Sequence, residues 1–316
     1  MEAEINNDLS AMIKLKENFK DLAEGNIQIP KGKLNSRIKN CIDDKVLSLY
    51  QDLLINDSGP LFKHFLASIP NILEELSRIS ISLKKLNESD DFLCSYWEIE
   101  AFDGTNGRAL NKILKTEINI LTNSPNFSNK KYFINYNSSG KNYFEFGTFF
   151  EIYDLMFQKK QFFDFIYEMA AFQFYGRDRY EHVSLVKKRL AKRGIAIFLE
   201  KLMNSDENEF ILQEDTKDWI YKKRFFSEEE IIWKRKFMLE DMHKGLLTKN
   251  EFEITLCSLF ENVALIWNST NFYEYLATND TEKFDRFLCE IGDPYIETVF
   301  QFYMPVLIKR GANVYK

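Results

Sequence analysis

From about residue 92 the sequence alternates short apolar runs with longer stretches of helical periodicity. In chain order the apolar runs are FLCSYWEIE, INILT, NYFEFG, FDFIYEM and GIAIFLEK. Such alternation predicts parallel strands joined by crossover helices, because parallel neighbours need long connections. Farther on, VALIWN and FYEYLAT stand three residues apart and predict an antiparallel hairpin. The sequence therefore predicts a doubly wound α/β sheet that an antiparallel strand closes.

Two other segments are predicted to be helical. Within residues 1–90, helices are expected in DLSAMIKLKENFKDLAEG, which ends at Gly25, and in LNSRIKNCIDDKVLSLYQDLL. GPLFKHFLASIPNILEELSRISISLKKL predicts one more helix, or two helices interrupted at Pro70. We therefore expect an N-terminal helical region over 1–90 and an α/β domain over 91–316. That domain would carry a helical insertion at about 205–260.

Charge and composition narrow the classes of partner. The net charge is −6 and the pI is near 5.4, which disfavours binding to nucleic acid duplexes. The sequence has no run of 18 apolar residues and no secretory segment at its start, so no membrane partner is expected. Its four cysteines and three histidines are scattered, and no metal site is expected. These features predict a cytoplasmic protein and leave a homodimer open.

A small polar turn, FDGTNGR, follows the strand-like SYWEIE. In a doubly wound sheet, ligands bind at the carboxyl ends of the strands. Small residues there let backbone N–H groups approach a ligand closely. Two of the 12 glycines in the chain, Gly104 and Gly107, lie in this turn. The alternative is a plain strand-to-helix turn in which Asp103 or Asn106 caps the helix.

Several strings carry a resemblance to a known family. LAKRG before IAIFLEK is similar to a helix, a glycine turn and a strand that ends in an acid. With the closing hairpin, this order resembles the class I S-adenosylmethionine-dependent methyltransferases. EIEAFDGTNGR, FQFYG and WNSTNFYE resemble an uncharacterised bacterial group of that family with cyanobacterial members, over about residues 92–295. The resemblance implies a Rossmann-like seven-stranded sheet with an antiparallel last strand, and S-adenosyl-L-methionine as the cofactor.

The sequence departs from the family at two places. The family favours E-x-G-x-G-x-G in its first loop, and the frame that begins at Glu100 puts Phe102 and Asn106 at two glycine positions. Asn tolerates positive φ, whereas Phe102 fits beside a cofactor only with its ring turned away. The second strand of the family ends in an acid that binds the ribose hydroxyls. Thr122 and Asn123 stand there instead, so weaker cofactor binding is expected.

The resemblance also implies roles for particular residues. The expected cofactor-binding residues follow the strand ends: Glu100, Phe102, Asp103, Gly104, Thr105, Asn106, Gly107, Arg108, Thr122, Asn123, Ser124, Asn126 and Gly147. The expected catalytic residues lie at the end of the fourth strand: Glu168, Gln173 and Tyr175. The expected substrate-binding residues are Arg177, Trp233, Asn268, Asn271 and Tyr273. Arg177 would anchor an anionic substrate. The alternatives are packed aromatics, solvated arginines and ordinary turn residues.

The expected function is methyl transfer to a small-molecule or natural-product acceptor. Methyl transfer from a sulfonium requires acceptor and methyl to be held in line, so no fixed catalytic triad is expected. The segment 205–260 would serve as a lid that excludes water. A methyltransferase of proteins, including host proteins, and a binding protein without catalysis on the same fold are alternatives. NAD-dependent chemistry is less favoured because the loop lacks G-x-G-x-x-G.

Overall fold

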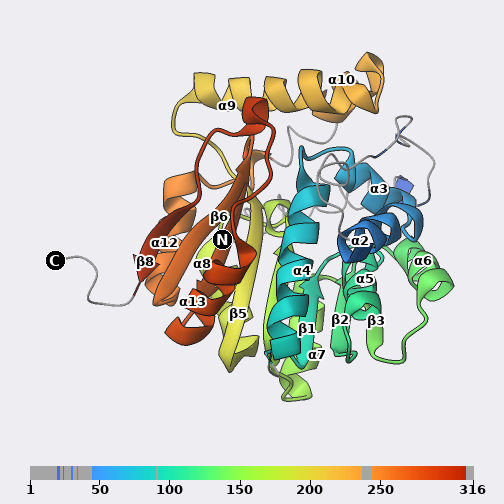
Figure 1. Ribbon diagram of the computed structural model, residues 1–316. Coiled ribbons are helices and arrows are strands. Elements are labelled where there is room, and N and C mark those ends of the chain that lie inside the picture. Colours follow the sequence, from blue (N-terminus) through green and yellow to red (C-terminus); the bar gives the residue numbers. More distant parts are fainter. Residues whose placement is uncertain are drawn as a thin grey trace.

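The computed structural model describes residues 45–89, 92–236 and 243–310, with five isolated residues before them. Its centre is an eight-stranded sheet in the order β3-β2-β1-β4-β5-β7-β6-β8 (Figure 1). The strands are β1 Ser95–Ile99, β2 Asn119–Ser124, β3 Asn142–Phe146, β4 Phe163–Met169, β5 Leu190–Lys201, β6 Asn262–Ser269, β7 Phe272–Thr278 and β8 Val306–Arg310. Strands β1 to β5 pair in parallel, and β7 runs antiparallel to both β5 and β6.

This topology confirms the predicted doubly wound α/β sheet with an antiparallel strand. The order β3-β2-β1-β4-β5 reverses direction between β1 and β4, which makes their carboxyl ends the switch point of the sheet. The predicted number of seven strands omits β8, which pairs antiparallel with β6 at the edge. The strand β8, with the sequence VLIKR, is short and partly exposed. It contains only three consecutive apolar residues, too few to predict a strand from the sequence.

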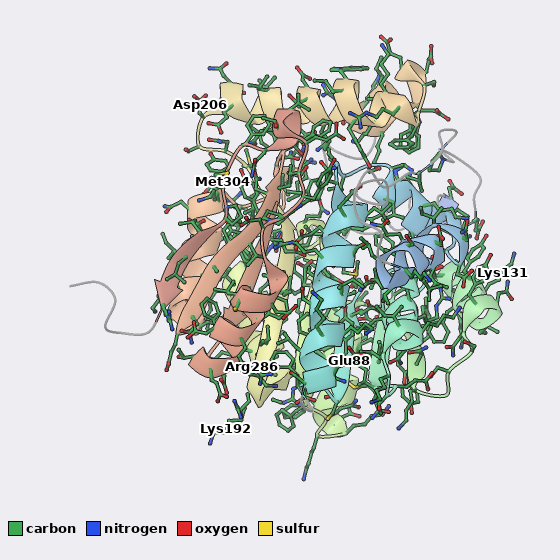
Figure 2. All side chains as sticks on the ribbon, viewed as in Figure 1. Glu88, Lys131, Lys192, Asp206, Arg286 and Met304 are labelled. Atoms are coloured by element: carbon green, nitrogen blue, oxygen red, sulfur yellow. The ribbon has the colours of Figure 1, made fainter. Side chains whose placement is uncertain are left out.

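Helices cover both faces of the sheet. On one face lie α4 Ile72–Ser89, α5 Thr105–Ile113 and α13 Thr281–Ile291, whose apolar residues share one core with Phe165 and Ile197. On the other face lie α7 Phe149–Gln158, α8 Arg179–Arg189 and α12 Lys249–Leu259, which pack on Trp97 and Phe198. Short α6 Ser128–Tyr136 packs beside β3. Charged side chains such as Lys131 and Lys192 point outward from this layered body (Figure 2).

The N-terminal helices rest on the first of these faces. The described ones are α2 Lys45–Asn56, α3 Pro60–Leu66 and α4, so the segment around Pro70 forms two helices. Tyr50, Leu54 and Phe62 from α2 and α3 belong to the same core as α4 and the sheet. Most of the helix expected to end at Gly25 lies outside the described residues, although Lys20, Asp21 and Glu24 are described and helical. Most of the start of the next expected helix is also outside them.

The predicted insertion forms α9 Glu207–Asp215, a π-helical turn over Thr216–Tyr221, a 3-10 turn over Lys222–Arg224 and α10 Glu228–Lys234. Helices α9 and α10 lie across one end of the sheet (Figure 1). Helix α10 opens with the capping box that its sequence predicts, in which Ser227 and Glu230 exchange hydrogen bonds. Tyr221, Phe226 and Ile231 join this segment to Ala67 and Phe300 in a separate small core. No helix in the described ranges is long and apolar enough to cross a membrane.

A buried ion pair joins the start of α8 to β5. Arg179 Nε donates to a carboxylate oxygen of Glu200 at 2.8 Å, and both side chains have no exposed area. The charge of Arg179 also opposes the mutual repulsion of Glu200 and the neighbouring buried Glu168. Burial nevertheless raises the pKa of both carboxyl groups above the ordinary range.

We predict that Arg179→Met lowers the free energy of unfolding by about 3–5 kcal/mol, because it leaves buried carboxyl groups without their cation. The matched control is Arg193→Met, because Arg193 forms an exposed ion pair with Asp280. The control should leave stability nearly unchanged. Urea unfolding followed by circular dichroism measures both. Equal stability of the two variants would show that the buried pair is dispensable.

Candidate functional site

A pocket opens at the carboxyl ends of β1, β2, β4 and β5, on the switch point of the sheet. It encloses about 1100 Å³ of empty space, part of which is open to solvent. Its floor comes from residues that end the strands, such as Ser124 and Lys201, or follow them directly, such as Glu100 and Ala170. Helix α3 and the segment from the π-helical turn to α10 supply its other walls. This is the place where doubly wound sheets bind ligands.

The turn between β1 and α5 is organised around a buried carboxylate, Glu98. Its oxygens accept hydrogen bonds from Tyr96 Oη at 3.0 Å, Asn106 Nδ2 at 2.7 Å and Thr122 Oγ1 at 3.0 Å. The backbone N–H of Gly107 donates to the same group. Burial raises the pKa of Glu98, and these four hydrogen bonds oppose the rise. Glu98 therefore ties β1, β2 and the first turn of α5 together.

Three alternating residues of the turn have left-handed backbones. Glu100, Phe102 and Gly104 have φ of 51°, 57° and 69°. Counted from Glu98, the pattern E-x-G-x-G-x-G places its three glycine positions on these residues. Asn106 lies inside α5 and does not have positive φ, contrary to the frame that begins at Glu100. Because Glu98 and Glu100 stand two residues apart, the sequence alone is compatible with a pattern that begins at either of them.

Glu100 and Phe102 are the members of this turn that line the pocket. The ring of Phe102 turns toward α3, with its centroid 5.7 Å from that of Phe62 and 4.8 Å from that of Phe65. Glu100 accepts a hydrogen bond from the backbone N–H of Phe149 at 2.7 Å and another from the hydroxyl of Tyr175. The pocket wall here is therefore aromatic, with one held carboxylate.

The rest of the turn faces the N-terminal helices. Asp103 accepts hydrogen bonds from the backbone N–H of Gly59 and from Thr105 Oγ1, both at 2.7 Å. Arg108 Nη2 donates to the carbonyl of Asp57 at 3.1 Å and lies 3.6 Å from Asp103. These contacts fasten the start of α3 to the turn. Asp103, Thr105 and Arg108 are buried, and they lie outside the set of residues that line the pocket.

Both glycines of the turn have steric roles. A Cβ on Gly104 would lie 2.7 Å from Thr122 Oγ1, and one on Gly107 would lie 2.7 Å from Glu98 Oε2 and from Ile120 Cγ2. Gly104 also needs its left-handed φ. Both residues therefore permit close packing of the turn on β1 and β2, and neither lines the pocket.

The end of β2 divides its polar residues between structure and pocket. Asn123 Oδ1 accepts from Trp97 Nε1 at 3.0 Å and from the backbone N–H of Glu100 at 3.1 Å, while its amide donates to the carbonyl of Gly147. Ser124 and Asn126 line the pocket, whereas Thr122, Asn123 and Gly147 do not. The neutral residues that could meet a ribose are therefore Ser124 and Asn126.

The end of β4 brings two of the three expected catalytic residues to the pocket. Gln173 and Tyr175 line it, but Glu168 caps its own turn by accepting from the backbone N–H groups of Ala171 and Phe172. Gln173 Nε2 donates to the carbonyl of Ala170 at 2.6 Å, and its buried Oε1 has no hydrogen-bond partner in the part of the chain that the structure describes. Burial, with the charge of Glu100, raises the pKa of Tyr175 well above 10, so its hydroxyl stays protonated.

The five expected substrate-binding residues lie outside the pocket lining. Arg177 is about half exposed and pairs with Glu251 at 3.0 Å. Asn268 holds the hairpin by donating to the carbonyl groups of residues 270 and 272 at 2.9 and 3.0 Å. Tyr273 accepts from Gln213 Nε2 at 3.3 Å, and Trp233 is half-buried on α10. Asn271 comes nearest in function, because its Oδ1 accepts from a lysine that does line the pocket.

That lysine belongs to a group that sequence reasoning missed. The lysine cluster consists of Lys201, Lys217, Lys222 and Lys234, and all four line the pocket. Lys201 ends β5, and the other three come from the segment that lies across the sheet. Burial lowers the pKa of Lys201, and it lowers the pKa of Lys217 to about 7. The signal available in the sequence was a lysine, rather than an acid, at the very end of the fifth strand.

No protein-family model and no curated sequence matches the chain. Solved structures of similar fold include the plantazolicin methyltransferase BpumL in complex with SAH, at 13% identity and a TM-score of 0.48, over 74% of this chain and 95% of that chain. A putative caffeoyl-CoA O-methyltransferase from Staphylococcus aureus shares 13% identity, with a TM-score of 0.43, over 76% and 95% of the two chains. The O-methyltransferase TomG from Streptomyces achromogenes, solved with SAM, shares 12% identity and a TM-score of 0.43, over 75% and 91%. The similarity is one of fold alone.

We predict that Gly107→Ala destabilises the protein by about 1–3 kcal/mol, because the added methyl group overlaps a held carboxylate and a strand side chain. Gly140→Ala is the control, since a Cβ there meets nothing within 4 Å and its φ is not positive. The control should stay within about 0.5 kcal/mol of the parent protein. Thermal or urea unfolding distinguishes them, and similar values for both would contradict the close packing described for the turn.

Proposed function

We propose that the chain is an S-adenosyl-L-methionine-dependent methyltransferase that acts on a small-molecule or natural-product acceptor. The observation that carries the proposal is the pocket at the switch point of a sheet whose β7 is reversed. The left-handed turn after Glu98 forms part of the wall of this pocket. The sequence resemblance implies this combination of sheet and loop. The finer assignment, to the bacterial group that the strings resemble, rests on those strings alone.

The residues present fit the cofactor. A nucleoside needs a mostly apolar pocket with a few polar groups that fix its orientation. The pocket offers the Glu100 carboxylate, Ser124 and Asn126 at the ends of β1 and β2, and the buried Oε1 of Gln173, which has no hydrogen-bond partner among the described residues. We propose that these four residues hold the adenosine half. When bound, S-adenosylmethionine would supply an electrophilic methyl group on a sulfonium.

The contribution of the protein would be positioning and the exclusion of water. Helix α3 covers the pocket from the side of the N-terminal helices, and residues 217–234 cover it from the insertion. We propose that the part of the predicted lid, about 205–260, that lies across the sheet, from α9 to α10, excludes water and that α3 completes the enclosure, whereas α12 packs on a face of the sheet. Because Tyr175 stays protonated and donates to Glu100, its proposed role is to orient that carboxylate rather than to act as a base.

The enclosure favours a small acceptor over a protein side chain, which would need an open groove. We further propose that the chain acts in the cytoplasm, alone or as a homodimer, without nucleic acid or membrane as a partner. Transfer of a radiolabelled methyl group to extracts of small molecules, compared with lysate proteins, tests this choice. Labelling of lysate proteins alone would favour the protein methyltransferase.

We predict that the purified protein binds S-adenosylhomocysteine and that Asn126→Asp strengthens the binding about fivefold. A hydrogen bond to a charged acceptor contributes roughly 1 kcal/mol more than one to a neutral acceptor. Asn119→Asp is the control, because Asn119 is exposed at the opposite end of β2. Isothermal titration calorimetry measures all three proteins.

Failure of the folded protein to bind either S-adenosylmethionine or S-adenosylhomocysteine would contradict the proposal. That result would favour a binding protein without catalysis on the same fold. An equal gain from Asn119→Asp would show that the effect reflects overall charge rather than the ribose position.

A further inference from the structure

The lysine cluster lies on one side of the pocket. Lys201 ends β5, and Lys217, Lys222 and Lys234 come from the insertion. The side chains assigned above to the adenosine half follow β1, β2 and β4 instead. The cluster therefore borders the space that remains for the acceptor, next to Phe272 at the start of β7.

The cluster holds more positive charge than its neighbours neutralise. Lys201 and Lys217 share one carboxylate, Glu214, at 2.8 and 2.7 Å. Lys222 pairs with Asp218 at 2.6 Å, and Asp218 also pairs with Arg235 at 2.5 Å. Four lysine side chains thus meet two carboxylates.

Lys234 differs from the others in its partners. It contacts His64 Nε2 at 2.5 Å and Ser68 Oγ at 3.2 Å, and neither of these partners is a carboxylate. Burial, together with the positive charge of Lys222, lowers the pKa of Lys234 well below its ordinary range. An anion beside Lys234 would favour its protonated form. Lys234 therefore points to an anionic group that the described residues do not supply.

The rest of the pocket lining is mostly apolar. Phe65, Phe174 and Phe272 belong to the pocket lining, and Lys217 Nζ lies 5.3 Å from the ring centroid of Phe272. We propose that the acceptor is an amphipathic anion, whose carboxylate or phosphate group binds the lysine cluster while its apolar body packs on these rings. This inference rests on the proposed function and names its substrate class. Lysines, rather than the expected Arg177, then anchor the anion.

The pKa of Lys217 also supports an anionic acceptor. Burial is the largest cause that lowers the pKa of Lys217 to about 7, and the positive charges of Lys201 and Lys222 lower it further. The carboxylates of Glu214 and Asp218 act in the opposite direction. A bound anion favours the protonated lysine, so binding takes up protons. Affinity for the anion should consequently fall as pH rises through about 7.

The test uses three probes with one apolar body: phenylbutyrate, phenylbutyl phosphate and phenylbutanol. Each is titrated by calorimetry into the full-length protein near neutral pH, and S-adenosylhomocysteine is titrated separately. We expect at least one anion to bind about tenfold more tightly than the alcohol, because only the anion forms charge-assisted hydrogen bonds. A preference between the two anions identifies the head group as carboxylate or phosphate.

Substitution of the lysines provides the structural control. Lys234→Gln and Lys222→Gln should each weaken anion binding about tenfold and leave the affinity for the alcohol unchanged. Lys223→Gln is the matched control, because Lys223 follows Lys222 in sequence, is 57% exposed and pairs with Glu228 outside the pocket. Thermal unfolding checks that each variant is folded, and either pocket variant suffices if the other is not.

The outcomes separate this inference from the proposed function. Binding of S-adenosylhomocysteine with no preference for anions, or with no loss in the pocket variants, would overturn the anionic acceptor and leave the methyltransferase standing. Preference for anions that the pocket variants lose supports the lysine site. If S-adenosylhomocysteine fails to bind in that case, the methyltransferase falls and the anion site remains.

Discussion

The site depends on one buried carboxylate. Glu98 is the last residue but one of β1, accepts hydrogen bonds from Thr122 on β2 and from Asn106 and Gly107 on α5, and is fully removed from solvent. Because a buried charge must be satisfied, the strand ends and the helix start are held in one arrangement around it. The left-handed turn that follows then places Glu100 and Phe102 toward the pocket.

The same turn explains why the N-terminal helices belong to the site. Asp103 and Arg108 bind the backbone at residues 57–59, and Phe102 packs on the rings of α3. The insertion approaches from the other side and brings its lysines to the same space. Two segments outside the alternating α/β pattern thus build most of the walls, while the strand ends build the floor. The chemistry of the floor suits a nucleoside, and that of the walls suits an anion with an apolar body.

Much of the fold follows from the sequence because its signals are local. Apolar runs such as FDFIYEM become strands at the predicted residues, and Pro70 separates two helices as a residue without a backbone N–H should. The lysine cluster could not be predicted in this way, because residues 201, 217, 222 and 234 meet only after the insertion folds over the sheet. The loop frame was ambiguous for another reason. Glu98 and Glu100 are both acids at a strand end, and only backbone φ values show which one starts the pattern.

The most direct test of the central claim is a crystal structure of the protein grown with S-adenosylhomocysteine. The account predicts electron density for the ligand in the pocket at the ends of β1, β2 and β4, with its polar groups near Glu100 and Asn126 and its sulfur facing the lysine side. Density for the ligand at another place on the molecule, with this pocket filled by protein side chains, would contradict it.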